Sequence, residues 1–294
     1  AVGNTLFFHA NDGTVGQELW KSNGTTAGTV LVKDIRAGAF SSSTGNFYNH
    51  SGILYFSANN GSTGIELWKS NGTTAGTVLV KDIRTGGSFS SSIPSGFKSV
   101  AGTLLFGARD DTNGGELWKT DGTTAGTVLV KDINPGNGYA NVSAIYEISG
   151  VGYFSANDGT NGTELWKTDG TAAGTVLVKD INPGSSNSYP FYITELLGKI
   201  YFHAETASKG VELWESDGTT AGTKLVKDIN PGSNHSNPND LIAFNGKLIF
   251  SAEELLFGNE PWVYDPSSCA FSSTLPTASG TYTSASAKLD GSWL

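Results

Sequence analysis

Short apolar runs recur along the chain, and most are bounded by Asn-Gly or Asp-Gly pairs. The runs Ile53 to Phe56 and Val78 to Val80 are apolar at consecutive positions. Consecutive apolar positions are typical of strands whose sheet is covered on both faces by neighbouring sheets. No segment shows sustained helical periodicity. The pattern therefore predicts an all-β protein built from short strands and tight turns.

A repeat organises these runs. The string Glu-Leu-Trp starts at residues 18, 66, 116, 164 and 212 and returns as Glu260-Pro261-Trp262, so the period is 48 or 50 residues. Each period holds four short runs joined by hairpin signals. A period of this length with four strands predicts a β-propeller of four-stranded antiparallel blades, six of them visible in the sequence.

Strand order follows from the lengths of the links. The longest link in each unit, residues 182–188 for example, suits the crossing from the outer strand of one blade to the inner strand of the next. We therefore expect the Val-Leu-Val-Lys-Asp-Ile run to be the outer strand and the run Leu241 to Phe244 to be an inner strand.

The motif resembles that of a known family. The copy from Glu164 to Thr171, continued by Ala173 to Thr175, is similar to the bacterial ELWxxDGT-repeat proteins, and the likeness covers about residues 1 to 265. Asn23 and Asn71 replace the family Asp, and the sixth copy is degenerate. The resemblance implies a surface-exposed or secreted propeller module of a large bacterial protein, often attached to a sorting domain of the type IX secretion kind. It implies no established reaction.

The repeats predict the domain boundaries. We expect a propeller over residues 1–266, while residues 267–294, rich in Ser, Thr and Ala, are a closing strand, a linker or the start of a further domain. A strand near Cys269 to Ser273 is the favoured interpretation. Because Ala1 and Val2 match Ala243 and Phe244 of an inner strand, we expect the chain to begin within a longer precursor.

Charge and hydropathy bear on the partners. The formal net charge is -9, and only three residues are Arg. This balance argues against nucleic acid or an anionic membrane as a partner. No apolar stretch approaches the roughly 20 residues that a membrane-spanning helix needs. Protein or carbohydrate at the cell surface, together with further domains of the same chain, are the expected partners.

Residues repeated in every blade are interpreted first as fold residues, because each blade has the same packing problem. In a strand, Glu18 and Trp20 share one face, so we expect the recurring Glu to pair with the recurring Lys or to cap a neighbouring turn. The Asp of the hairpin tip is expected to form an Asx turn, as Asn can. The structural motif comprises Glu18, Trp20, Glu66, Trp68, Glu116, Trp118, Glu164, Trp166, Glu212, Trp214, Glu260 and Trp262.

The loop between the second and third strands offers clustered oxygen atoms. The candidate metal ligands there are Asp12, Asp110, Asp111 and Asp158. Carboxylate and amide oxygens suit Ca²⁺, although the loops lack the spacing of known calcium loops and the same residues are adequate to turn a hairpin. No other cofactor is expected.

Blade-specific residues are the remaining candidates for function. The fifth and sixth copies place Glu205, Glu253 and Glu254 in the same loop, and the crossings contain Tyr139, Tyr189 and Tyr192. Aromatic side chains can stack on sugars or plug the joints between blades. The sequence contains no recognisable catalytic set.

Two functions remain open. The first is a non-enzymatic extracellular or cell-surface module for adhesion, ligand binding or surface assembly in a larger exported bacterial protein. The alternative is a propeller glycoside hydrolase or lyase whose site is built from the blade-specific residues. A cluster of two or three carboxylates around a polar pocket would favour the enzyme.

Overall fold

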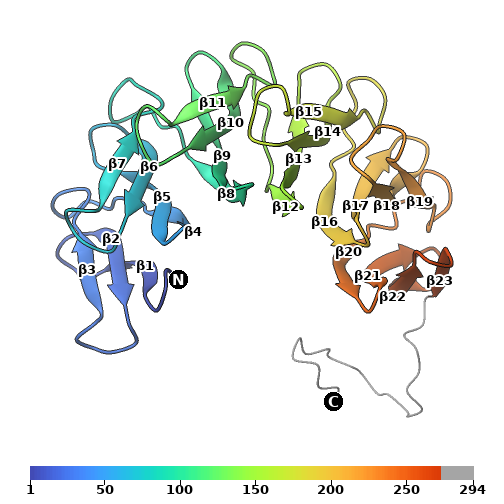
Figure 1. The fold of residues 1–294 in the computed structure, drawn as a ribbon, viewed down its shortest axis with the longest axis horizontal. Helices are drawn as coiled ribbons and strands as arrows, with labels where there is room; N and C mark the ends of the chain where they lie inside the picture. The colour runs from blue at the N-terminus through green and yellow to red at the C-terminus, as the bar shows by residue number, and fades with distance from the viewer. Residues whose placement is uncertain (273–294) are drawn as a thin grey trace.

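The structure is a computed structural model that describes residues 1–272. These residues form six antiparallel sheets that follow an arc, which confirms the predicted propeller blades (Figure 1). The first sheet has three strands and each of the others has four. The described residues contain no helix that could cross a membrane.

Each sheet is formed by consecutive strands. Blade one contains β1 (Leu6–Asn11), β2 (Gln17–Ser22) and β3 (Val30–Lys33). Blade two contains β4 (Gly45–His50), β5 (Ile53–Asn59), β6 (Ile65–Ser70) and β7 (Val78–Lys81). Blade three contains β8 (Ser95–Val100), β9 (Thr103–Asp110), β10 (Gly114–Thr120) and β11 (Val128–Lys131).

The second half of the arc repeats the same order. Blade four contains β12 (Tyr146–Ile148), β13 (Val151–Asn157), β14 (Thr163–Thr168) and β15 (Val176–Lys179). Blade five contains β16 (Phe191–Leu196), β17 (Lys199–Thr206), β18 (Gly210–Ser216) and β19 (Lys224–Lys227). Blade six contains β20 (Asn239–Phe244), β21 (Lys247–Glu254), β22 (Gly258–Asp265) and β23 (Ala270–Ser272).

The predicted strand order is confirmed. The first strands of successive four-stranded blades, β4, β8, β12, β16 and β20, lie on the concave side of the arc, and neighbouring ones contact each other (Figure 1). The Val-Leu-Val-Lys strands β7, β11 and β15 lie on the convex side. The crossing from each outer strand therefore leads back to the concave side of the next blade.

The core lies between the blades. At the joint of blades two and three, the buried residues are Tyr55, Leu67, Val80 and Ile83 from one side and Phe97, Leu104, Phe106, Ala108 and Trp118 from the other. Equivalent clusters occupy the other four joints. An internal blade thus buries both of its faces, which explains the runs of consecutive apolar residues.

The recurring Lys of the outer strand links adjacent blades. Lys33 Nζ donates to the Thr77 carbonyl of the next blade at 2.8 Å and lies 5.9 Å from the centre of the Trp68 ring. The equivalent Lys81 and Lys131 make the same two contacts. The expected pairing of this Lys with the motif Glu is therefore wrong, because the ammonium group binds the neighbouring blade.

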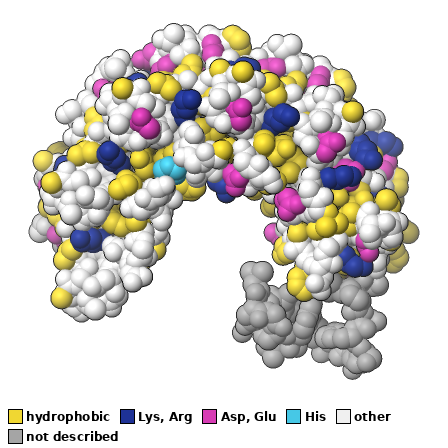
Figure 2. All heavy atoms as spheres, in the orientation of Figure 1, with side chains coloured by type: hydrophobic (Ala, Val, Ile, Leu, Met, Phe, Trp, Pro, Cys, Tyr) yellow, Lys and Arg dark blue, Asp and Glu magenta, His cyan; other side chains and the backbone are white. Residues whose placement is uncertain are grey.

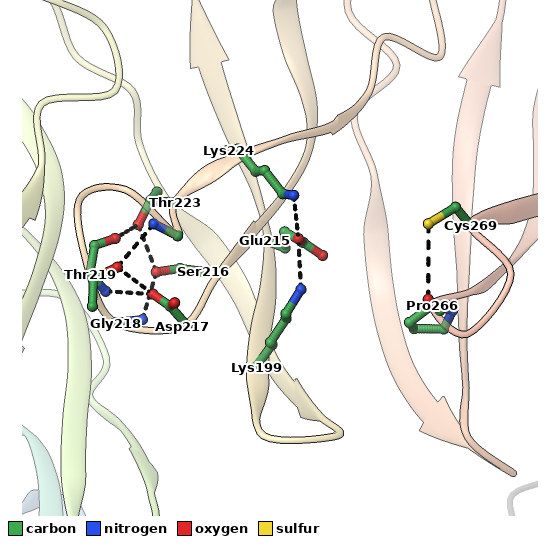
Figure 3. A network of polar contacts seen from close by, with 11 residues as sticks. Lys199, Glu215, Ser216, Asp217, Gly218, Thr219, Thr223, Lys224, Pro266 and Cys269 are labelled. Carbon is green, nitrogen blue, oxygen red and sulfur yellow. Dashed lines mark hydrogen bonds and ion pairs between the residues drawn. The ribbon is translucent and has the colours of Figure 1, made fainter.

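The hairpin tips form the predicted Asx turns. Asp217 Oδ1 accepts from the Thr219 amide at 2.9 Å and from its hydroxyl at 2.6 Å (Figure 3). Gly218 follows with a φ of 84°, which Gly adopts without a Cβ penalty. Asn23 and Asn71 accept the same two hydrogen bonds in blades one and two, so the Asn copies are equivalent to the Asp copies.

The arc is open over the described residues, and the first and sixth blades lie at its two ends (Figure 1). Blade one has no complete inner strand; before β1 only Val2 and Thr5 form an isolated bridge. Trp20 is half-buried, and no blade among the described residues covers its side of the sheet, whereas the other five motif Trp residues are at most 7% exposed.

Blade six is closed by the strand expected near Cys269 to Ser273. This strand is β23, and Phe271 pairs with Tyr264 of β22. Its presence compensates for the missing Val-Leu-Val-Lys run. Most of the segment 267–294, from residue 273 onward, lies outside the described residues.

We expect the variant Trp118→Ala to lower the free energy of unfolding by roughly 3 to 5 kcal/mol, because it leaves a cavity between two blades. Trp20→Ala is the matched control and should cost clearly less, since Trp20 is already half-buried. Urea unfolding monitored by circular dichroism measures both. Equal losses for the two variants would contradict the role of the Trp as an inter-blade core residue.

Candidate functional site

Five of the six motif glutamates, Glu18, Glu66, Glu116, Glu164 and Glu212, are buried and cap the crossing loops, whereas Glu260 of the sixth blade is half-buried. Glu66 Oε2 accepts from the Ile83 amide at 2.8 Å, and Oε1 accepts from the Ser92 amide at 2.9 Å. Glu18 binds Ile35 and Ser42 in the same way. The predicted turn-capping role is thus confirmed: one carboxylate holds both ends of the loop that carries the chain to the next blade.

Burial makes these carboxyl groups unusually easy to protonate. Loss of hydration raises the pKa of four motif glutamates to about 7, namely Glu66, Glu116, Glu164 and Glu212. Burial also raises the pKa of Glu18. A shifted pKa is common in catalytic sites. Here the shift recurs in five blades beside the same backbone amides, so it belongs to the fold.

The candidate metal ligands turn their own loops. Asp12 Oδ1 accepts from the Thr14 amide at 2.8 Å and from the Thr14 hydroxyl at 2.7 Å, and the hydroxyl bond lowers the pKa of Asp12. Asp110 and Asp158 accept bonds in their loops from Asn113 and Asn161, respectively. Asp111 pairs with Arg84 at 2.6 Å. Over residues 1–272, no group of three His, Cys, Asp or Glu side chains is placed to hold a metal, and Ca²⁺ stays a prediction.

The blade-specific acidic residues lie on two blades. Glu205 near the end of β17 and Glu253 near the end of β21 occupy equivalent positions, and their amides donate to Ser188 and Ser236 carbonyls at 2.8 and 2.7 Å. Glu254 is the next residue of β21. The part of the chain that the structure describes does not bring the three carboxylates into one cluster with a further acidic or metal-binding side chain.

The joint of blades five and six departs from the repeat. Glu215 replaces the third-strand Lys, and its Oε1 pairs with Lys199 at 2.9 Å and with Lys224 at 3.4 Å (Figure 3). Cys269 lies across a pocket of about 250 Å³ that these residues line. At the equivalent position of blade four, Lys167 Nζ donates to the Gly218 carbonyl at the hairpin tip of blade five at 2.9 Å. Glu215 is buried, and its ion pairs take the place of that bond at the joint of blades five and six.

The crossing aromatics divide into two groups. Phe47 and Tyr48 pack against the inter-blade cores, as the plugging interpretation predicts. Tyr189, Phe191 and Tyr192 are instead 55%, 42% and 36% exposed. The Tyr192 ring lies edge-on to Phe191 and to His203, with ring centroids 4.9 and 5.3 Å apart. Tyr189, Phe191, Tyr192 and His203 form the aromatic patch of blade five.

One position has the same strained backbone in each of the five crossings. The residue after the loop anchored by the motif Glu has positive φ between 46° and 51° and is exposed in all five crossings: Ser43, Ile93, Asn141, Tyr189 and Asn237. Left-handed backbone is costly for a β-branched residue such as Ile93. The backbone conformation is the same in all five crossings while the exposed side chain differs. This arrangement is expected where a rigid scaffold displays variable side chains to a partner.

A pocket of about 320 Å³ lies in blade three between two successive crossings. Ile93 and Ser95 line one side, Tyr139, Asn141 and Val142 line the other, and Gly107 to Arg109 of β9 also line it. The other blades carry His9, Ser57, Ser155, His203 or Ser251 where Gly107 stands. The absent side chain leaves this space open.

Gly115 is the second departure of blade three. It pairs with Arg109 across the hairpin, at the position of Gln17, Ile65, Thr163 and Val211. A Cβ on Gly115 would lie 2.7 Å from Cδ1 of Tyr139, so only Gly admits the ring at this place. The two glycines and Tyr139 therefore shape the wall of the pocket together.

Sequence reasoning missed Ile93, Gly107, Arg109 and Asn141. Tyr139 was predicted, and it does line the pocket. A signal was present, because Gly107 and Arg109 both break the pattern of the second strand within three residues. A side chain that is missing from one copy of a repeat can mark a site as clearly as one that is added.

No protein-family model matches the chain, and neither does any curated protein. Among solved structures, a mutant puromycin hydrolase complexed with PGG is 10% identical, with a TM-score of 0.48 over 96% of this chain and 47% of that one. A putative TolB from Agrobacterium tumefaciens is 11% identical, with a TM-score of 0.39 over 77% of this chain and 78% of the other. The chain spans about half the length of the hydrolase. At these identities the likeness concerns the fold alone.

The motif glutamates predict an unusual pH dependence. Their folded pKa lies above that of the unfolded chain, so the unfolded state releases protons first and stability falls as pH rises from about 4.5 to 7. The variant Glu116→Gln should reduce the slope by up to about 1.4 kcal/mol per pH unit. Urea unfolding at pH 5, 6 and 7 measures this. An unchanged slope would show that Glu116 does not titrate in this range.

Proposed function

We propose that this chain is a non-catalytic ligand-binding β-propeller module of an exported bacterial protein, displayed at the cell surface for adhesion or surface assembly. The observation that carries the proposal is the exposed left-handed position of the crossings. Five equivalent residues share one backbone conformation and differ in chemistry, from Ser43 to Ile93 and Tyr189.

The repeated charged residues support a scaffold role. Five motif glutamates hold crossing loops, and Lys33, Lys81, Lys131 and Lys179 bind carbonyls of the next blade. These groups are occupied by structural bonds. Recognition would then fall to the blade-specific side chains, which project from a frame whose positions the blades fix.

The aromatic patch of blade five suits a saccharide or an apolar protein segment. Exposed rings at ring-centroid separations of 4.9 to 6.2 Å offer flat apolar area with hydrogen-bonding edges. Figure 2 shows hydrophobic side chains between the blades and toward the concave side, while charged side chains are scattered over the face in view. Dispersed charge favours stacking over bulk electrostatics as the source of affinity.

The proposed location rests on the resemblance of the motif to the ELWxxDGT repeats. That resemblance implies a surface-exposed or secreted module of a large bacterial protein, often attached to a sorting domain of the type IX secretion kind. Surface labelling of intact cells tests this part of the proposal, and a protein confined to the cytoplasm would overturn it.

The binding role has a direct test. The variant Tyr192→Ala should weaken binding to a bacterial surface polysaccharide about tenfold, since a stacked ring contributes on the order of 1 kcal/mol or more. Phe89→Ala is the matched control, because Phe89 is a crossing aromatic that is 99% exposed and lies outside the patch. Surface plasmon resonance against a glycan panel gives both affinities. Equal losses would contradict a specific role of the patch.

The alternative, a glycoside hydrolase or lyase, is tested with the same panel. Release of reducing ends from any glycan, with loss of that activity in Glu205→Gln, Glu253→Gln or Glu254→Gln, would overturn the non-catalytic proposal.

A further inference from the structure

The pocket of blade three differs from the aromatic patch of blade five in one respect: it contains an arginine. Arg109 is half-buried, and its Nε donates to the Ser91 carbonyl at 2.7 Å. This bond fixes the plane of the guanidinium group. None of the ion pairs formed by residues 1–272 includes Arg109.

The carboxylate that lines the same pocket is already engaged. Glu116 accepts from the Ile133 amide at 2.7 Å through Oε2 and from the Asn134 amide at 3.2 Å through Oε1. Glu116 is 1% exposed. Arg109 therefore lines a pocket in which the only acidic lining residue, Glu116, is held by backbone amides.

The remaining walls are suited to a ring that carries hydroxyl groups. Tyr139 is 48% exposed, so part of its ring is open to a ligand, and Ile93 adds apolar area to the lining. Asn141 brings an amide that can donate and accept hydrogen bonds. A volume of about 320 Å³ suits one sugar ring better than a folded peptide segment.

We propose that this pocket binds an acidic monosaccharide unit of a glycan, with Arg109 on the carboxylate and Tyr139 against the ring. A planar guanidinium group held at Nε can bind a carboxylate through its two terminal nitrogens, and this geometry distinguishes the acid from its neutral counterpart. The inference rests on the binding role proposed above and assigns a ligand class to a second place on the same frame.

Blade three offers a variant that fills the pocket without disturbing the fold. Gly107→His introduces the residue that blades one and five carry as His9 and His203. The nearest atoms to a Cβ at position 107 are 3.8 Å away, which is ordinary contact. Ser155→Gly, which removes the equivalent side chain in blade four, is the matched control.

The test compares methyl glucuronide with methyl glucoside by isothermal titration calorimetry on the full chain. We expect the glucuronide to bind at least tenfold more tightly, Arg109→Gln to abolish the difference, and Arg109→Lys to retain part of it. Gly107→His should lose binding while its thermal midpoint stays that of the parent. Ser155→Gly should bind as the parent does.

Three outcomes would overturn the proposal: equal affinity for the two sugars, glucuronide binding that survives Gly107→His, or tighter binding of an acetylated glutamate amide than of the glucuronide. The proposed function is judged separately. If Tyr192→Ala weakens glycan binding while the pocket variants have no effect, the binding module stands and only the acidic-sugar pocket is wrong. If the parent protein binds no glycan in the panel and no methyl glucuronide in the calorimeter, both proposals fail.

Discussion

The burial of each sheet between two others is the interaction on which this structure depends. A blade of four short strands has two apolar faces and buries little surface alone, so its stability comes from the joints. The joints also contain the polar contacts that set the distance between blades, such as the bond from Lys81 to the Thr127 carbonyl. The Glu-Leu-Trp motif therefore serves the interface between blades. Its Trp packs in the joint, and its Glu binds backbone amides of the loop that crosses to the next blade.

Much of this could be predicted from the sequence because a repeat states the same physical requirement several times. Four runs with one long link per unit were sufficient to predict the strand order, and the Asp-Gly and Asn-Gly tips were sufficient to predict the Asx turns at Asp217 and Asn23. The partner of the recurring Lys could not be predicted, because the sequence of one blade does not specify how far away, or in which orientation, the next blade lies.

The candidate site illustrates a different limit. Tyr139, Tyr189 and Tyr192 were predicted because aromatic residues can be recognised in a crossing, and all three are exposed in the structure. The pocket beside Tyr139 exists because Gly107 and Gly115 lack side chains, and a cavity has no residue of its own in the sequence. Clustered aspartates such as Asp110 were predicted as candidate metal ligands. A turn whose backbone amides need an oxygen acceptor selects the same residue types, so the sequence does not separate the two roles.

The left-handed crossing position has a consequence for how such a surface changes over time. Ile93 and Tyr189 are exposed and lie outside the joints, so replacing one side chain by another there changes the local backbone strain but leaves the contacts between blades as they are. Under the proposed binding role, the ligand could therefore change by single substitutions at these five positions while every joint between blades stays as it is.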